Sequence, residues 1–157
     1  MFERLTTRSP FAEVVTSALE EARRRGDRRM GTEHLLLGLL RHPPTATAVG
    51  VDLDAARAAL DDLDHAALRS IGIDTDRVPA LADLPRRHPP ITISAVTSGS
   101  RTALRHAVDS TGTRTRHLAP RYLLIELLDR ESPDPVVELI DHLGVDRTAV
   151  RARLSPG

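Results

Sequence analysis

The sequence predicts an all-helical protein that contains two copies of one helical unit. Apolar residues recur with helical spacing along most of the chain, and three segments of its first half reappear in its second half. Only the triplet 91–93 alternates in the manner of a strand, and it is too short to form a sheet. The length of 157 residues suffices for one domain with a proper core. We therefore expect about eight helices in a single domain over residues 1–157.

The repeat consists of three pairs of matching segments. The pairs are 18–22 with 103–107, 30–40 with 118–128, and 50–60 with 144–154. In the last pair, seven of the eleven residues are identical. The separation between partners grows from 85 to 88 and then to 94 residues, and it changes only where loops are expected. A duplicated unit shows this pattern after sequence drift.

Repeat one is predicted to begin with a surface helix and a buried helix. The first starts at Ser9 and Pro10, an N-cap followed by proline, and ends at Gly26. Its apolar stripe consists of Phe11, Val14, Val15, Ala18, Leu19 and Ala22. Thr32 is the expected N-cap of the second helix. The body of that helix, 35–40, is apolar almost all round, so we expect it to be buried.

Proline divides the rest of repeat one. Pro43 and Pro44 are expected to end the second helix. A short third helix over 45–49 follows, and Asp52 is expected to cap a longer fourth helix that runs toward Ser70.

Repeat two is predicted to contain the same four helices, at about 99–110, 120–130, 134–143 and 146–154. Its third helix has a fuller apolar face than the shortened counterpart in repeat one. Between the repeats, a short helix from residue 72 precedes four prolines, which predict a connector without regular structure. The predicted boundaries are repeat one at 1–72, the connector at 73–92 and repeat two at 93–157.

Composition argues against several classes of function. The chain has no cysteine and no lysine, so thiolate metal sites, phosphate-loop lysines and Schiff-base lysines are excluded. A formal net charge of zero and only three aromatic residues argue against nucleic-acid binding. No apolar run approaches membrane-spanning length, and the first residues lack a signal-peptide pattern, so we expect a cytoplasmic protein.

The sequence contains no recognisable catalytic or metal-binding motif. Its seven histidines lack the two-ligand spacing of a zinc-binding helix, and its serines lack the Gly-x-Ser-x-Gly pattern. A hydrolytic site that is assembled only in three dimensions stays open as an alternative. We expect a non-enzymatic monomer without a cofactor.

Five arginines gather around the predicted end of the first helix: Arg23, Arg24, Arg25, Arg28 and Arg29. Cations complement the negative C-terminus of a helix, which predicts a solvated helix end. The alternative is a docking surface for an acidic partner. Aspartates at 61, 62 and 64 form an acidic counterpart that can neutralise the arginines.

Four segments of the chain resemble the N-terminal repeat domain of Clp ATPases: 1–8, 30–40, 50–53 and 144–146. The most specific of these contains Gly-Thr-Glu-His-Leu-Leu-Leu-Gly at 31–38. The resemblance implies a stand-alone domain folded as a pseudo-twofold bundle of two four-helix repeats. Domains of this family receive substrates and adaptor proteins for the Clp protease, in some relatives arginine-phosphorylated proteins, and they bind certain cyclic-peptide antibiotics.

The resemblance also implies a single phosphoarginine-type site. In relatives that bind phosphoarginine, the glutamate of the Gly-Thr-Glu-His motif holds the guanidinium, and Glu33 occupies that position here. Thr6, Thr7 and Arg8 lie in the matching opening segment, where hydroxyls and an arginine can take the phosphate. Repeat two has Arg121 instead of the glutamate, so a second site of this kind is not expected.

Three neighbouring features have structural alternatives. Glu33 lies in the first turn of a helix, where a carboxylate is favoured by the helix dipole alone. His34 is expected to be a packed or capping histidine and not a ligand. Phe2 either anchors the N-terminus in the bundle or contributes to a groove for peptides or cyclic peptides.

Three functions follow from these features. The leading hypothesis is a module that binds unstructured or arginine-phosphorylated peptides, adaptors or a Clp ATPase, and modulates a Clp protease as adaptor, decoy or regulator. The second is sequestration of cyclic peptides or other small molecules that target Clp ATPases. The third is a helical hydrolase.

Overall fold

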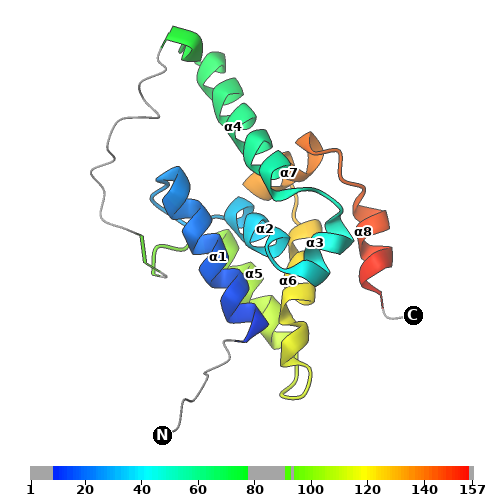
Figure 1. The fold of residues 1–157 in the computed structure, drawn as a ribbon. Helices are drawn as coiled ribbons and strands as arrows, with labels where there is room; N and C mark the ends of the chain where they lie inside the picture. The colour runs from blue at the N-terminus through cyan, green and yellow to red at the C-terminus, as the bar shows by residue number, and fades with distance from the viewer. Residues whose placement is uncertain (1–8, 78–90, 93, 156–157) are drawn as a thin grey trace, which may run out of the picture.

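The structure is a computed structural model that describes residues 9–77, 91, 92 and 94–155. This part of the chain contains eight α-helices, two short 3₁₀ helices and no strand, which confirms the predicted all-helical class (Figure 1). The helices of repeat one are α1 (Pro10–Arg25), α2 (Thr32–Leu40), α3 (Pro43–Val49) and α4 (Leu53–Ser70), followed by η1 (Thr75–Arg77). Those of repeat two are α5 (Ser98–Asp109), η3 (Arg116–Leu118), α6 (Ala119–Leu128), α7 (Pro135–His142) and α8 (Arg147–Leu154).

The two sets of four helices pack with pseudo-twofold symmetry. The equivalent helices of the two repeats are α1 and α5, α2 and α6, α3 and α7, and α4 and α8. Each contact between the repeats has a counterpart between the equivalent helices: α1–α6 and α5–α2, α2–α7 and α6–α3, and α3–α8 and α7–α4. The helices α2 and α6 also contact each other. Reciprocal contacts of this kind are those that a twofold axis between like units produces.

The core is shared by both repeats and centres on α2 and α6. The leucines at 35, 36, 37 and 39 are at most 1% exposed, as are those at 123, 124 and 127. Gly38 lets α1 approach α2 closely, because a Cβ at this position would lie 2.5 Å from the carbonyl oxygen of Val14. The predicted burial of the second helix is therefore confirmed, and its one small residue is needed for that packing.

Two details of the predicted helix ends were wrong. Gly31, not Thr32, is the N-cap of α2, and the Thr32 hydroxyl donates to Asp134 of the other repeat. Pro43 and Pro44 do not end α2, which stops at Leu40, but form the first turn of α3. Proline fits there because the first helical N–H groups have no partner inside the helix.

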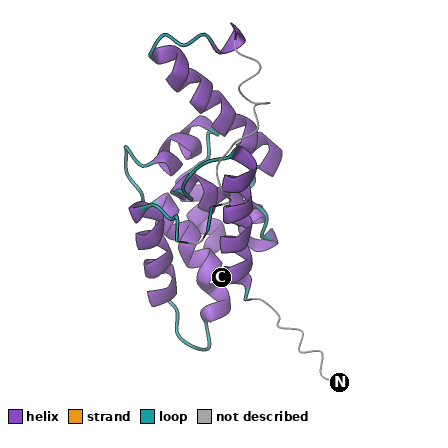
Figure 2. Cartoon of the chain, turned by 90° about the vertical axis from the view of Figure 1, so that its left-hand side faces the viewer, coloured by secondary structure: helices purple, strands orange, loops and turns teal. Residues whose placement is uncertain are grey.

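The repeats differ in their fourth helices more than in their third. The helices α3 and α7 have seven and eight residues, so the predicted shortening of the third helix was wrong, although α7 does bury the larger apolar side chains. By contrast, α4 has 18 residues and α8 has eight. Figures 1 and 2 both show the far half of α4 extending beyond the other helices.

Ion pairs join α1 to α4. Glu21 of α1 is 1% exposed and accepts two hydrogen bonds from the Arg57 guanidinium of α4, at 3.0 and 2.6 Å. Burial alone would raise the pKa of Glu21, but Arg57, with smaller contributions from Arg24 and Arg41, more than offsets this effect and the pKa is lowered. Arg25 pairs with Asp61 and Asp64, which confirms that this acidic cluster neutralises part of the arginine cluster.

No helix within the described ranges is both long enough and apolar enough to cross a bilayer. The short helix predicted from residue 72 is present as η1. The prolines of the predicted connector, at 79, 85, 89 and 90, lie outside the described residues.

Candidate functional site

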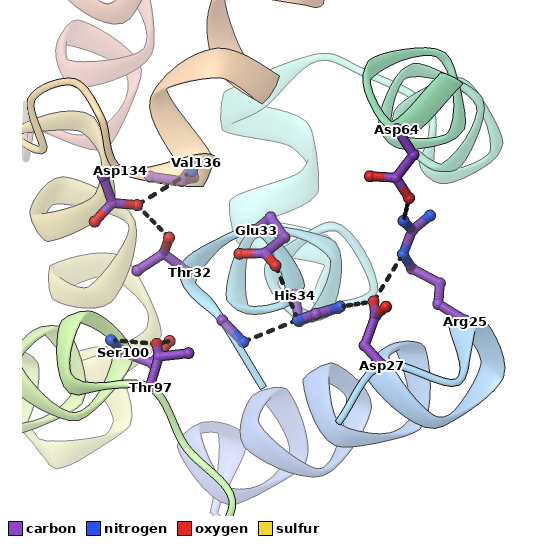
Figure 3. Close-up of polar contacts among 11 residues, drawn as sticks. Arg25, Asp27, Thr32, Glu33, His34, Asp64, Thr97, Ser100, Asp134 and Val136 are labelled. Atoms are coloured by element: carbon purple, nitrogen blue, oxygen red, sulfur yellow. Dashed lines mark hydrogen bonds and ion pairs between the residues drawn. The ribbon is translucent and has the colours of Figure 1, made fainter. Parts of the chain in front are cut away.

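Of the five predicted site residues, the structure describes Glu33. Phe2, Thr6, Thr7 and Arg8 lie outside the described residues, so their proximity to Glu33 stays a prediction. Glu33 is the second residue of α2, and this helix start lies at the junction of the two repeats. In Figure 3, Glu33 lies between the Thr32–Asp134 pair and the chain of contacts from His34 to Arg25.

The Glu33 side chain folds back toward its own helix start and is 18% exposed. A Cβ added to Gly31 would lie only 2.3 Å from Glu33 Oε2. A carboxylate can therefore occupy this place only because residue 31 has no side chain. Gly31 of the sequence motif thus leaves the space that the Glu33 carboxylate occupies.

His34 closes the N-terminus of α2. Its Nδ1 accepts a hydrogen bond from the Gly31 N–H at 2.9 Å, which leaves Nε2 to carry the proton and donate to Asp27 Oδ2 at 2.7 Å. Burial would raise the pKa of Asp27, but the contacts of its carboxylate with His34 and Arg25 hold that pKa below its ordinary value. Since His34 is 1% exposed, it is a capping and packing residue, as predicted.

One oxygen of the Glu33 carboxylate lacks a hydrogen-bond donor within the described ranges. Its Oε2 is buried and has no hydrogen-bond partner among the described residues. Its Oε1 lies 3.5 Å from His34 Nδ1, whose lone pair already accepts from Gly31. Burial raises the pKa of Glu33, and the nearby carboxylates of Asp27 and Asp134 act in the same direction, while His34 and a hydrogen bond from the Glu33 backbone N–H act against them. A largely buried carboxylate with a free acceptor oxygen can accept hydrogen bonds from a cationic donor.

Two cavities meet at Glu33. The first, which we call the inter-repeat cavity, has a volume of about 460 Å³ and lies among 31–33, 97–99 and the loop that precedes α7. The second, which we call the α4 groove, has a volume of about 380 Å³ and is lined by residues of α2, α4 and α7. Glu33, Thr97 and Pro135 line both cavities.

The inter-repeat cavity is acidic. Glu33, Glu131 and Asp134 line it, and no basic side chain stands among its described lining residues. Arg130 lies behind the rim, where it donates to the Gly99 carbonyl at 2.8 Å and lies 3.9 Å from Asp134. This lining suits a guanidinium better than a phosphate, because a carboxylate accepts the N–H groups of the former and repels the latter.

The corresponding place in repeat two has the opposite charge. Arg121 stands at the position of Glu33, and Ala119 stands at the position of Gly31. The Arg121 guanidinium lies 6.0 Å from the centre of the Tyr122 ring, and its buried Nε has no hydrogen-bond partner among the described residues. The expectation that repeat two lacks a second guanidinium site is consistent with this charge and stays a prediction.

Sequence reasoning missed the contribution of repeat two to the site. Thr97, Glu131 and Asp134 line the cavity. In sequence, Glu131 and Asp134 lie about a hundred residues from Glu33, and Thr97 lies more than sixty residues from it. The one local sequence pattern at any of these residues was the predicted start of a helix at residue 134, and it did not indicate a place in the site. Within the described ranges, no group of three or more histidine or acidic side chains is arranged to hold a metal ion.

A comparison with models of known protein families agrees with the sequence motifs and places Glu33 in the matched region. Residues 5–81 match the family model of the Clp repeat (R) N-terminal domain, and this stretch contains α1 to α4 and Glu33. The chain therefore belongs to the Clp N-terminal domain family, as its sequence motifs predicted.

Proposed function

We propose that this protein is a non-catalytic binding module that recognises arginine side chains of unstructured peptides at Glu33, and so modulates a Clp chaperone-protease. The observation that carries this proposal is the Glu33 carboxylate itself. It is largely buried, its buried Oε2 has no hydrogen-bond donor among the described residues, and it lines two cavities at once. Membership in the Clp N-terminal domain family supports the wider role, in which the bound peptide belongs to a substrate or adaptor.

Arginine is the cation that fits this site best. A guanidinium offers several N–H donors in a fixed plane, so one edge can satisfy both oxygens of a carboxylate. Lysine offers a compact, strongly hydrated charge and would lose more hydration on contact with a largely buried carboxylate. We therefore expect arginine peptides to bind more tightly than matched lysine peptides.

Phosphoarginine is the second form to consider. Its guanidinium can approach Glu33 in the same way, but its phosphate must point away from Glu131 and Asp134. Thr6, Thr7 and Arg8 are the proposed phosphate partners. A preference for the phosphorylated peptide therefore indicates that this opening segment takes part in binding, and a preference for the unmodified peptide indicates that it does not.

Calorimetry on the full chain tests the proposal. Peptides that differ only in arginine, phosphoarginine or citrulline are titrated into the wild type and into Glu33→Gln. Citrulline keeps the shape of arginine without its charge, so we expect it to bind at least tenfold more weakly than arginine, which corresponds to the net value of a charge-assisted hydrogen bond, about 1.5–3 kcal/mol. We expect Glu33→Gln to abolish this discrimination.

The matched control is Glu131→Gln, which removes an exposed carboxylate from the same cavity. We expect it to change the arginine affinity by less than threefold, because exposed charges are well screened. Equal binding of arginine and citrulline peptides by the wild type would contradict the proposal. Cleavage of any peptide in these mixtures would contradict the non-catalytic part of it.

A further inference from the structure

The α4 helix carries an apolar stripe that leaves the bundle. Leu60, Leu63, Ala67 and Ile71 follow one another at intervals of three or four residues and so lie on one helix face. Their exposure increases along the helix: Leu60 is 5% exposed, Leu63 is half-buried, Ala67 is exposed and Ile71 is 72% exposed. The helices that cover the start of this stripe do not reach its end (Figures 1 and 2).

The stripe forms one wall of the α4 groove. Leu60, Leu63 and Ala67 line the groove on the α4 side, Pro135 and Glu138 line it on the α7 side, and Glu33 of α2 lines it as well. Glu138 is exposed and makes no ion pair within the described part of the chain. The apolar wall is thus continuous with the carboxylate that binds the guanidinium in the proposed function.

The charges around the groove favour a basic ligand. Four carboxylates line it, at positions 27, 33, 64 and 138, against two guanidinium groups, at 25 and 29. One of these guanidiniums, Arg25, is already bound to Asp27, Asp61 and Asp64. Glu33 and Glu138 remain as acceptors for an incoming cation.

From this juxtaposition we infer that the α4 groove is an aliphatic subsite beside the guanidinium site, so that the ligand is a peptide with an arginine and a nearby leucine-like residue. The inference rests on the proposed function, because the arginine on Glu33 anchors the peptide. From Leu60 to Ile71 the stripe spans about 16 Å at about 1.5 Å per helical residue. A peptide in extended form covers this length with about five residues.

A second copy of this chain fits the stripe less well. A symmetric dimer through this face would place the same surface against itself. The excess carboxylates along the groove would then face one another, and like charges across an interface are unfavourable. A basic and aliphatic peptide meets the same groove with complementary charge.

The test measures peptide binding to the full chain by fluorescence anisotropy. Each peptide of nine residues has one arginine, a serine-glycine background, and either leucine or alanine placed two to five residues from the arginine on either side. At the best spacing we expect leucine to strengthen binding roughly tenfold over alanine, which corresponds to partial burial of its extra methyl and methylene groups.

Two neighbouring alanines of α4 provide matched variants. Ala67→Gln places a polar side chain in the groove, whereas Ala66→Gln places it on an exposed position that does not line the groove. We expect Ala67→Gln to bind the leucine and alanine peptides with about equal affinity. In Ala66→Gln we expect the leucine peptide to keep its tighter binding. Glu33→Gln should weaken the leucine and alanine peptides by the same factor.

The outcomes separate the two claims. If arginine is preferred to citrulline but leucine gives no advantage at any spacing, or if the two glutamine variants behave alike, the aliphatic subsite is refuted and the proposed function stands. If arginine is not preferred to citrulline, both fail. Sedimentation that shows a dimer of the free chain, abolished by Ala67→Gln alone, would assign the stripe to a second copy and overturn the inference.

Discussion

The N-termini of α2 and α6 occupy equivalent places in the pseudo-twofold bundle, yet they carry opposite charges. Repeat one has Gly31 and Glu33, and repeat two has Ala119 and Arg121. In each case one buried polar atom of the charged side chain has no hydrogen-bond partner in the described part of the chain, Oε2 of Glu33 and Nε of Arg121. The duplicated backbone thus supplies the same position twice, and two residues in each repeat set the space and the charge at that position.

The largest expected difference between the two helix starts concerns stability. His34→Leu removes the acceptor of the Gly31 N–H and a donor to Asp27, and it leaves a buried N–H without a partner. We expect a loss of about 2–3 kcal/mol in the free energy of unfolding, measured by urea denaturation. The equivalent change in repeat two, Tyr122→Leu, removes no described hydrogen bond of the ring hydroxyl and should cost about 1 kcal/mol or less.

Equal losses in these two variants would show that His34 contributes only packing. In that case the capping role of His34, and the rigid orientation of Glu33 beside it, would be wrong.

The second expected difference is a lower stability of the free protein because of Glu33. Its pKa is raised by burial, so between the ordinary glutamate pKa and the raised one the folded state binds more protons than the unfolded state. Stability is therefore lost as the pH rises through this range. We expect Glu33→Gln to be more stable than the wild type by about 1 kcal/mol at pH 7, and the gain to disappear below about pH 4. Denaturation curves at several pH values measure this.

Glu13→Gln is a suitable control, because Glu13 also lies in the first turn of a helix but is exposed. We expect it to change stability by less than about 0.5 kcal/mol at any of these pH values. If Glu33→Gln were instead less stable than the wild type at pH 7, the carboxylate would be serving the helix dipole, and the candidate site would lose its main support.

The third expected difference is in binding, and it concerns the glycine of the motif. Gly31→Ala would bring a methyl group to within 2.3 Å of Oε2, so the flexible carboxylate must move. We expect roughly tenfold weaker binding of an arginine peptide, which corresponds to about 1.4 kcal/mol, with a modest change in stability. Gly99→Ala adds a methyl group in the same cavity at an ordinary distance of 3.4 Å or more from its neighbours, and it should alter the affinity by less than twofold.

Equal affinities of the Gly31→Ala and wild-type proteins would indicate that the bound carboxylate does not occupy the folded-back position. The comparison with Ala119 of repeat two would then carry no information about binding.

Much of the fold was predictable because it depends on local patterns. Apolar stripes, caps and the duplicated segments predicted the helices and their grouping, and the motif at 31–38 predicted Glu33. The errors at Thr32 and Pro43 have a common cause: each residue is compatible with two positions at a helix end. In one of the two cases a contact outside the helix favours the observed position. For Thr32 that contact is Asp134, which is 102 residues away in sequence.

The site was only half predictable for the same reason. Its acidic lining comes partly from the loop before α7, and its aliphatic wall comes from α4. No spacing in the sequence shows that these segments meet at Glu33. The length of α4 was expected, but its projection beyond the bundle depends on the much shorter α8 and on the shared core.

The most direct test of the central claim is the pKa of Glu33 itself, measured by nuclear magnetic resonance of the labelled side-chain carboxyl with and without a saturating arginine peptide. In the free protein we expect a pKa above the ordinary glutamate value, because the carboxylate is buried. In the complex we expect it to fall below the free value by at least one unit, because a guanidinium stabilises the charged form. An unchanged pKa under saturation, or an ordinary pKa in the free protein, would contradict the assignment of Glu33 as the guanidinium-binding carboxylate.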